Sequence, residues 1–284
     1  MSTRFLAFLQ GLDADLKAGL QEQLRILWTH HSTALEGNTL TLGETFFVLS
    51  EGMTIGGKSL KDHLEVVGHA RAIDLLTAWL QQEMPLGEAE LFALHQAVQT
   101  QVVVDIFAPV GRWKVEPNGA SFYQDGRLRF NDTYADPQDV PALMADWLTR
   151  LAEHRRQLPL SSNEAVATYV DLHASFVGVH PFADGNGRLA RLLANIPVLE
   201  AGYPPLILPR ERRAEYISTL AAWQTQVGKA TPERGLLPAR EKLAELEALC
   251  RDAWQSTLEM ITEFQARQAS RRPTTRLTPP APSS

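Results

Sequence analysis

Twelve consecutive residues, from His180 to Arg191, bring together an imidazole, a carboxylate, two glycines and two guanidinium groups. Glycines at positions 185 and 187 allow the backbone to turn so that successive N–H groups converge on one cluster of anionic oxygens. Arg188 and Arg191 are three residues apart, and the forked guanidinium group suits phosphate oxygens. This combination predicts a site for a nucleotide polyphosphate.

Two further side chains of this stretch could act on a bound phosphate. Asp184 is a suitable ligand for Mg²⁺ (or Mn²⁺), because Mg²⁺ prefers one or two carboxylates together with phosphate oxygens. His180 could accept a proton near neutral pH. Apolar runs flank the polar residues on both sides, so we expect them in a loop that opens a helix, where free backbone N–H groups and the positive dipole end favour an anion.

The elements that position this loop are expected to be helices. Apolar residues at helical spacing predict helices over 21–35, 41–50, 60–82, 88–102, 140–156, 163–177, 189–201, 211–226 and 240–268. Turn signals and short strand-like runs between 109 and 134 predict a single β-hairpin. The expected fold class is therefore mainly α.

The stretch resembles the signature of the Fic family of nucleotidyl transferases, H-x-F-x-[DE]-G-N-G-R-x-x-R, at every fixed position. The resemblance implies a Fic-type helical bundle with the hairpin as a flap beside the active site. It also implies transfer of AMP from ATP to a Ser, Thr or Tyr hydroxyl of a protein. Carried over residue by residue, it assigns catalysis to His180, Asn186 and Arg188, metal binding to Asp184, and nucleotide binding to Gly185, Asn186, Gly187, Arg188, Arg191 and Tyr216. For Tyr216, packing in the core is the alternative.

A second motif lies near the N-terminus. Ser32 to Asn38 resembles the [ST]-x-x-x-E-[GN] inhibitory motif of the same family. The resemblance implies that Glu36 pairs with Arg191 and so keeps this arginine from holding the γ-phosphate of ATP, with Ser32 as part of the regulatory motif. The alternative is an ordinary helix end with a solvated glutamate. A glutamate at this place could also orient a water and remove AMP from a modified protein.

A third segment, 109–134, is expected to meet the protein target. Gly111 to Lys114 resembles the start of the family's flap, which pairs with an extended segment of the target and aligns its hydroxyl. Strand addition of this kind depends little on the target's sequence. The target is either another protein or the chain itself, and a structural hairpin that covers the bundle is the alternative.

Two interpretations outside the family stay open. The run from Gly185 to Ala190 also fits the dinucleotide fingerprint G-x-G-x-x-[GA], which requires a strand directly before it. A non-catalytic helical binding module is the other, although it leaves His180 and Asp184 unexplained. The remaining histidines, His95 and His173 among them, are interpreted as ordinary helix residues, because no third metal ligand accompanies them at a suitable spacing.

Composition sets the wider limits. The chain has 284 residues, a formal net charge of −6 and 44% hydrophobic residues, as in an ordinary globular protein, and the acidic balance argues against nucleic acid. Its apolar runs are too short for a membrane span, and the N-terminus lacks the features of a signal peptide. A lone cysteine, Cys250, makes an intrachain disulfide impossible. We expect a cytoplasmic protein, and the sequence leaves a homo-oligomer open.

The same patterns predict four parts along the chain. Residues 1–85 form an N-terminal helical region that carries the inhibitory motif, and 86–230 form the catalytic core. Residues 231–270 form a C-terminal helical region that matches no motif. The Pro/Ser/Thr-rich tail 271–284 is expected to be disordered.

Overall fold

The structure is a computed structural model that describes residues 5–99, 108–124, 127–131, 134–236 and 239–271 of the chain. The expected mainly α class is confirmed. The helices are α1 (Ala14–Ala34), α2 (Leu42–Glu51), α3 (Leu60–Gln81), α4 (Glu88–Val98), α5 (Val140–Arg156), α6 (Ser162–Val179), α7 (Asn186–Leu193), α8 (Ile196–Glu200), α9 (Arg213–Val227) and α10 (Ala244–Ser270). Short 3-10 turns lie at Ala7–Leu9, Arg210–Arg212 and Arg240–Leu243.

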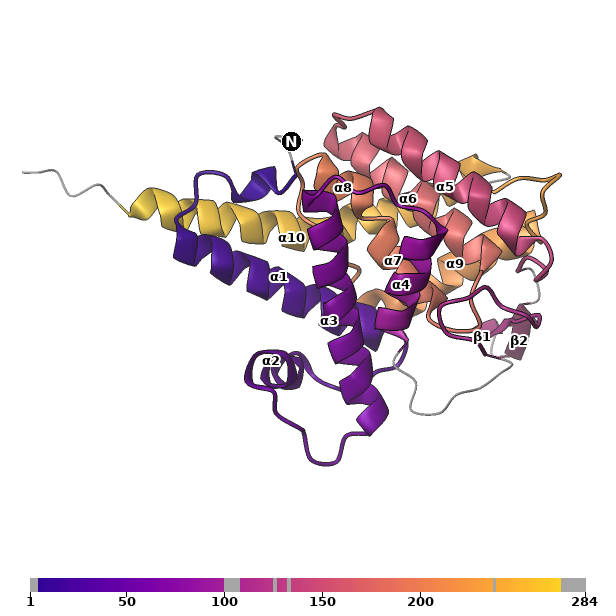
Figure 1. Ribbon diagram of the computed structural model, residues 1–284, viewed down its shortest axis with the longest axis horizontal. Coiled ribbons are helices and arrows are strands. Elements are labelled where there is room, and N and C mark those ends of the chain that lie inside the picture. Colours follow the sequence, from indigo (N-terminus) through magenta and orange to yellow (C-terminus); the bar gives the residue numbers. More distant parts are fainter. Residues whose placement is uncertain (1–4, 100–107, 125–126, 132–133, 237–238, 272–284) are drawn as a thin grey trace, which may run out of the picture.

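α6 is the central helix, packed against α5, α7, α8 and α10 (Figure 1). Every residue from Thr168 to Val179 is buried, so α6 lacks the polar stripe of a surface helix. It begins at a capping box, in which the Ser161 hydroxyl accepts from the Glu164 N–H and the Glu164 carboxylate accepts from the Ser161 N–H. Because α6 is enclosed, the loop that follows it has a fixed starting point.

The N-terminal helices frame one side of that loop. α1 packs against α3 and also contacts α7. α2 and the adjoining end of α3 project from the rest of the molecule (Figure 1) and share a small apolar cluster of Leu40, Val48 and Val66. Thr41 caps α2 in a second capping box, which explains why α2 starts so soon after the end of α1.

The C-terminal helix α10 lies alongside α1 and packs on α6 (Figure 1). Its buried residues recur every three or four positions, which gives it one apolar face. The Trp254 indole N–H donates to the Pro204 carbonyl at 3.1 Å and fastens this face to the core. One hydrophobic core runs from Phe8 to Phe264. The boundaries expected at residues 85, 230 and 270 stay a prediction.

The helix expected over 189–201 is in fact two helices, α7 and α8. Pro197 lies in the first turn of α8, and proline cannot donate the backbone hydrogen bond that would continue α7. The side chain of Asn195 fills the break, accepting from the Leu206 N–H at 2.7 Å and donating to the Leu206 carbonyl at 3.0 Å. The break ends α7 after two turns and keeps its start aimed at the loop.

Two short strands form the expected hairpin region. β1 (Ala120–Gln124) pairs antiparallel with β2 (Arg127–Asn131), with Ala120 opposite Asn131, and β1 contacts α9. Whether this hairpin acts as a flap stays a prediction. α4 ends at Val98, and residues 100–102 of the helix expected over 88–102 lie outside the described residues, as does the tail from 272. Among the described helices, each is too short or too polar to cross a lipid bilayer.

Buried histidines make folding pH-dependent. His69 on α3 is fully buried, and neither of its ring nitrogens has a hydrogen-bond partner within the described part of the chain. Burial, and then the nearby Arg191, lower the pKa of His69 to about 3 from the ordinary value of 6.5. A group with a depressed pKa in the folded state contributes stability above pH 6.5 and loses it as the pH falls toward 3.

We therefore expect the free energy of unfolding to fall below about pH 6.5, and His69→Leu to flatten that fall. The variant should remove up to about 1.4 kcal/mol per pH unit of the slope below pH 6, because it removes one proton taken up on unfolding. Urea unfolding at pH 7.5, 6.5, 5.5 and 4.5 measures both curves. Parallel curves for wild type and variant would show that His69 is not held neutral.

Candidate active site

The loop begins with a left-handed turn at His180. α6 ends there, and the His180 N–H still donates to the Phe176 carbonyl at 2.9 Å although its φ is 52°. A histidine in this backbone region is uncommon and must be held by its surroundings. The turn brings the imidazole to the wall of a cavity next to the end of α6.

Asn186 closes the loop on itself. Its Oδ1 accepts from the Phe182 N–H at 2.9 Å, and its Nδ2 donates to the Phe182 carbonyl at 2.8 Å. Phe182 is fully buried, so it anchors the loop in the core. Both polar groups of the Asn186 side chain bond to the loop backbone, and only 2% of the residue is exposed. The catalytic and nucleotide-binding roles that the resemblance assigns to Asn186 stay predictions.

The backbone after this closure presents amides at the start of α7, an arrangement that suits an anion. Gly185 adopts a φ of 79°, which a residue with a Cβ rarely adopts, and α7 starts directly after it. The first hydrogen bond of α7 runs from the Leu189 N–H to the Gly185 carbonyl at 3.0 Å. The amides of residues 186–188 therefore have no acceptor inside the helix, and they lie at its positive end.

A cavity of about 270 Å³ opens beside these amides. It collects residues that are far apart in the sequence. Its lining includes Glu36, Tyr134, His180, Asp184, Gly185, Asn186, Gly187, Arg213, Tyr216 and Gln224. The structure thus brings the loop, the inhibitory motif and α9 to one place.

His180 is held in the form of a neutral base. The Tyr134 ring stacks on the imidazole with centroids 3.8 Å apart and planes at 13°. Nδ1 lies 3.3 Å from the Val177 carbonyl, which assigns the proton to Nδ1 and leaves Nε2 as the acceptor. Burial, and then the charge of Lys114, lower the pKa of His180 to about 3. At neutral pH the imidazole is therefore neutral, with its one ring proton on Nδ1.

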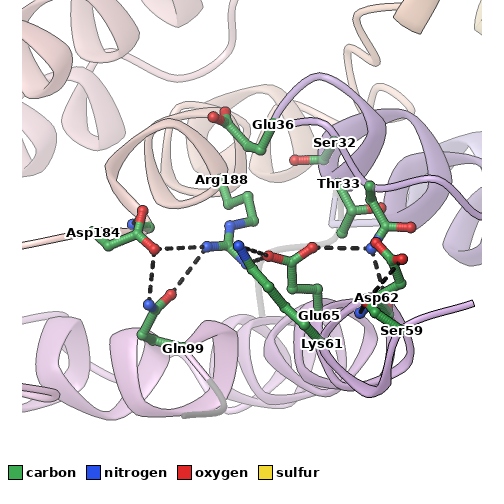
Figure 2. Close-up of polar contacts among 12 residues, drawn as sticks. Ser32, Thr33, Glu36, Ser59, Lys61, Asp62, Glu65, Gln99, Asp184 and Arg188 are labelled. Atoms are coloured by element: carbon green, nitrogen blue, oxygen red, sulfur yellow. Dashed lines mark hydrogen bonds and ion pairs between the residues drawn. The ribbon is translucent and has the colours of Figure 1, made fainter. Parts of the chain in front are cut away.

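Asp184 and Arg188 form an ion pair at 3.7 Å, and both also bond to a third residue, Gln99, which sequence reasoning missed (Figure 2). Burial alone would raise the pKa of Asp184, but Arg188 and the Gln99 amide outweigh it and the net pKa is lowered. The carboxylate is therefore ionised at neutral pH. Arg188 is almost fully buried, and on its far side Glu65 of α3 lies 3.6 Å from Nη1.

The donor set fits a magnesium ion that is shared with phosphates. The Asp184 side chain is 63% exposed and lines the cavity. Within the described residues, no group of three His, Cys, Asp or Glu side chains could hold a metal. An accessible carboxylate beside backbone amides at a helix start suits Mg²⁺, which keeps waters and takes its other ligands from a bound phosphate.

Arg191 bonds to two residues of the N-terminal motif, Ser32 and Glu36, and to Tyr216 of α9. Its Nη2 donates to Glu36 Oε1 and to the Ser32 carbonyl, each at 2.7 Å, and its Nε donates to the Ser32 hydroxyl at 3.1 Å. Nη1 reaches the Tyr216 hydroxyl at 3.3 Å. Burial works to lower the pKa of Arg191, but the Glu36 carboxylate more than offsets it and the pKa is raised. The arginine stays charged and is held away from solvent.

His95, which the sequence left as an ordinary helix residue, belongs to the loop's support. Its Nδ1 accepts from the Gly111 N–H at 2.8 Å, and its Nε2 donates to the Asp184 carbonyl at 3.1 Å. Its ring also stacks on Phe182 at 3.9 Å. Nothing in the local sequence distinguished this histidine, because its partners lie 16 and 89 residues away.

The segment expected to start the flap also holds the loop. The buried Lys114 donates from its backbone N–H to the Pro181 carbonyl at 2.9 Å and from Nζ to the Asn118 amide oxygen at 2.7 Å. Asn118 in turn donates to the Phe182 carbonyl at 2.7 Å. Burial lowers the pKa of Lys114 to about 8. Lys114 and Asn118 therefore fix the backbone directly after the His180 turn.

These observations remove the dinucleotide interpretation. It required a strand before Gly185, and α6 occupies that place. Comparison with known proteins agrees with the geometry: a family model described as Fic/DOC family matches residues 85–197. The chain carries a Fic/DOC family domain.

Curated relatives match a longer stretch of the chain than the family model does. Protein adenylyltransferase fic-1 of Caenorhabditis briggsae is 34% identical over 216 residues, which cover 71% of this chain and 37% of that protein. Protein adenylyltransferase Fic of Drosophila melanogaster is 33% identical over 196 residues, which cover 66% of this chain and 35% of that protein. The chain thus spans little more than a third of the length of these relatives.

Solved structures resemble nearly the whole chain. A Fic domain containing signaling protein from Bacteroides thetaiotaomicron has a TM-score of 0.75 at 27% identity and covers 90% of this chain and 93% of its own. Fic-1 (residues 134–508) from C. elegans has a TM-score of 0.66 at 27% identity and covers 88% of this chain and 65% of its own. The likeness therefore extends beyond the Fic domain itself.

Gly187 gives a test of the Glu36–Arg191 contact. A Cβ at Gly187 would collide with Glu36 Oε1 and would lie 3.1 Å from Arg191 Nη1. We expect Gly187→Ala to displace Glu36 and to cost about 1–3 kcal/mol, the range for a hydrogen bond to a charged group. In a Glu36→Gly background the same change should be stabilising by up to about 1 kcal/mol, because alanine favours the helix.

Chemical denaturation of the four proteins in this double-mutant cycle measures both effects. Equal effects of Gly187→Ala in the two backgrounds would show that the contact contributes nothing in solution.

Proposed function

We propose that this chain is a Mg²⁺-dependent protein adenylyltransferase that moves AMP from ATP to a protein hydroxyl and is held inactive by Glu36. One observation carries the proposal: the unprotonated His180, the free amides of the loop and the inhibitory Glu36 all line the same cavity. The names of the curated relatives point to the same activity. The non-catalytic interpretation gives no reason for a base and an anion site to share one cavity.

The loop would hold the triphosphate. The N–H groups of residues 186–188 would donate to the α- and β-phosphates at the positive end of α7. Arg188 would hold the β-phosphate, and Arg191 the γ-phosphate once Glu36 has left it. Asp184 would hold Mg²⁺, which when bound offsets charge on the phosphates. The Tyr216 ring, on the cavity wall, is the proposed neighbour of the nucleoside.

His180 would accept the proton of the attacking hydroxyl. The hydroxyl oxygen bonds to the α-phosphorus while the bond from that phosphorus to the β-bridging oxygen breaks, and pyrophosphate leaves. The proton moves to Nε2, since Nδ1 faces the Val177 carbonyl. Tyr134 holds the imidazole plane by stacking. Such a base contributes roughly 100- to 10,000-fold in rate.

Inhibition would be a competition for Arg191. Glu36 and Ser32 occupy three of its donors through Nε and Nη2, so a γ-phosphate must displace a carboxylate that is already in place. The Glu36 side chain is 39% exposed and lies on the cavity side of this pair, so it can move without unfolding α1. Removing AMP from a modified protein is the second candidate, favoured by this same carboxylate on the cavity wall.

The protein target and the location are proposed more broadly. The hairpin region 109–134, or the part of it that is exposed, would bind an extended segment of another protein or of a second copy of the chain. Cytoplasmic residence and a homo-oligomer remain predictions from the sequence.

Labelled ATP tests the proposal. We expect Glu36→Gly, incubated with Mg²⁺ and ATP labelled at the α-phosphate, to label itself or proteins of a lysate much more than wild type does. ATP labelled at the γ-phosphate should leave no label, because AMP rather than phosphate is transferred. Equal labelling of wild type and Glu36→Gly would contradict the inhibitory role.

A second variant tests the role of His180 as the base. His180→Ala in the Glu36→Gly background should lower the labelling rate roughly 100-fold or more while ATP binding, measured by calorimetry, persists. Labelling that continues at the original rate would remove His180 from its role. Label from the γ-phosphate instead would reassign the chain to phosphate transfer.

A further inference from the structure

Asp184 and Arg188 form an ion pair but share no direct hydrogen bond. Asp184 lies two residues before the start of α7, and Arg188 lies in the first turn of that helix. Their closest atoms, Asp184 Oδ2 and Arg188 Nη2, are 3.7 Å apart, too far for a hydrogen bond. The Gln99 amide lies beside this pair and bonds to both members: its Nε2 donates to Asp184 Oδ2 at 2.9 Å, and its Oε1 accepts from Arg188 Nη2 at 2.9 Å (Figure 2).

Gln99 is fixed in this place from behind. It caps the end of α4, where its backbone N–H donates to the His95 carbonyl at 2.8 Å. His95, four residues earlier, donates to the Asp184 carbonyl. A Cβ at Gly185 would approach Gln99 Oε1 to 3.4 Å, so the loop backbone lies close against the amide. One end of one helix thus holds the main chain and the side chain of Asp184.

Glu65 lies on the other side of Arg188 but accepts no hydrogen bond from it. Glu65 Oε1 lies 3.6 Å from Nη1, beyond hydrogen-bond distance, while Glu65 Oε2 accepts from the Asn38 side chain at 2.9 Å. The Nε and Nη1 groups of Arg188 are buried and, among the described residues, have no hydrogen-bond partner. Buried donors without acceptors are costly, so this guanidinium is kept in a position that an added acceptor would relieve.

We propose that Gln99 is a positioning residue that keeps Asp184 and Arg188 apart, so that the carboxylate stays open to a divalent cation and the guanidinium to a phosphate. The identity of these two ligands rests on the proposed function, but the separation itself does not. A neutral amide suits this task because it satisfies both charges at once. Without it, a direct pair would use the same oxygen and nitrogen that the cation and phosphate require.

The first test needs no ligand. A crystal structure of Gln99→Leu should show Asp184 and Arg188 in a direct hydrogen bond of about 2.8–3.0 Å, the usual length between charged partners. The two side chains staying apart in this variant would overturn the proposal. This outcome is independent of whether the chain transfers AMP, so a failure here is distinct from a failure of the proposed function.

The second test measures binding in the Glu36→Gly background. Calorimetric titration with ATP in EDTA, and again with excess Mg²⁺, gives the gain in affinity that the cation adds. We expect Gln99→Leu to weaken ATP binding about tenfold in EDTA, as one charged hydrogen bond would. We also expect it to reduce the gain from Mg²⁺. Gln96→Leu, an exposed glutamine on the same helix, is the matched control and should leave both values unchanged.

If Gln99→Leu does not fold, Gln99→Glu replaces it. A glutamate keeps the acceptor for Arg188 but removes the donor to Asp184, so the gain from Mg²⁺ should change. Unchanged values for both Gln99 variants would refute the positioning role. A loss shared equally by Gln96→Leu would show a general effect on α4 and would also refute it.

Discussion

Two buried guanidinium groups one turn apart are the constraint on which this structure depends. Arg188 and Arg191 are 3% and 2% exposed, and like charges in a poorly solvated place must be compensated. The compensation comes from elements far away in the chain: Glu36 at the end of α1, Glu65 on α3 and Gln99 at the end of α4. The N-terminal helices are therefore part of the site as much as of the scaffold.

The loop between α6 and α7 is held in place because the backbone groups on its inner side are hydrogen-bonded to surrounding side chains and backbone. The Asn186 amide closes on Phe182, His95 binds the Asp184 carbonyl, and Lys114 binds the Pro181 carbonyl. Backbone groups on the inner side are thereby satisfied, while the amides at the start of α7 are left for a ligand. An anion site formed in this way needs little reorganisation when the ligand arrives.

Charge and burial also set the charge states of His180 and Asp184 in the cavity. Burial beside Lys114 keeps His180 neutral, whereas Arg188 and Gln99 keep Asp184 ionised. Two titratable groups four residues apart are thus both held in the deprotonated form at neutral pH, one neutral and one negatively charged. Such a division is what a reaction needs when it moves a proton at one point and offsets phosphate charge at another.

The sequence alone determined the local features of this protein. Helical periodicity placed most helices, and the spacing from His180 to Arg191 fixed a loop that opens a helix, because both depend on residues within a few turns of one another. The break between α7 and α8 was missed although Pro197 signals it, since a continuous apolar pattern outweighed the single proline. Local spacing did not show that both polar groups of the Asn186 side chain bond to the backbone of Phe182.

Only the tertiary structure decided which residues contact Asp184 and Arg188. Glu65, His95 and Gln99 lie on or at the end of helices with ordinary polar and apolar patterns. Their partners among Asp184 and Arg188 lie 85 to 123 positions further along the chain. Periodicity shows which face of a helix is buried, but not what it will face. That choice is made by how α3 and α4 pack against the start of α7, where two arginines had to be buried together.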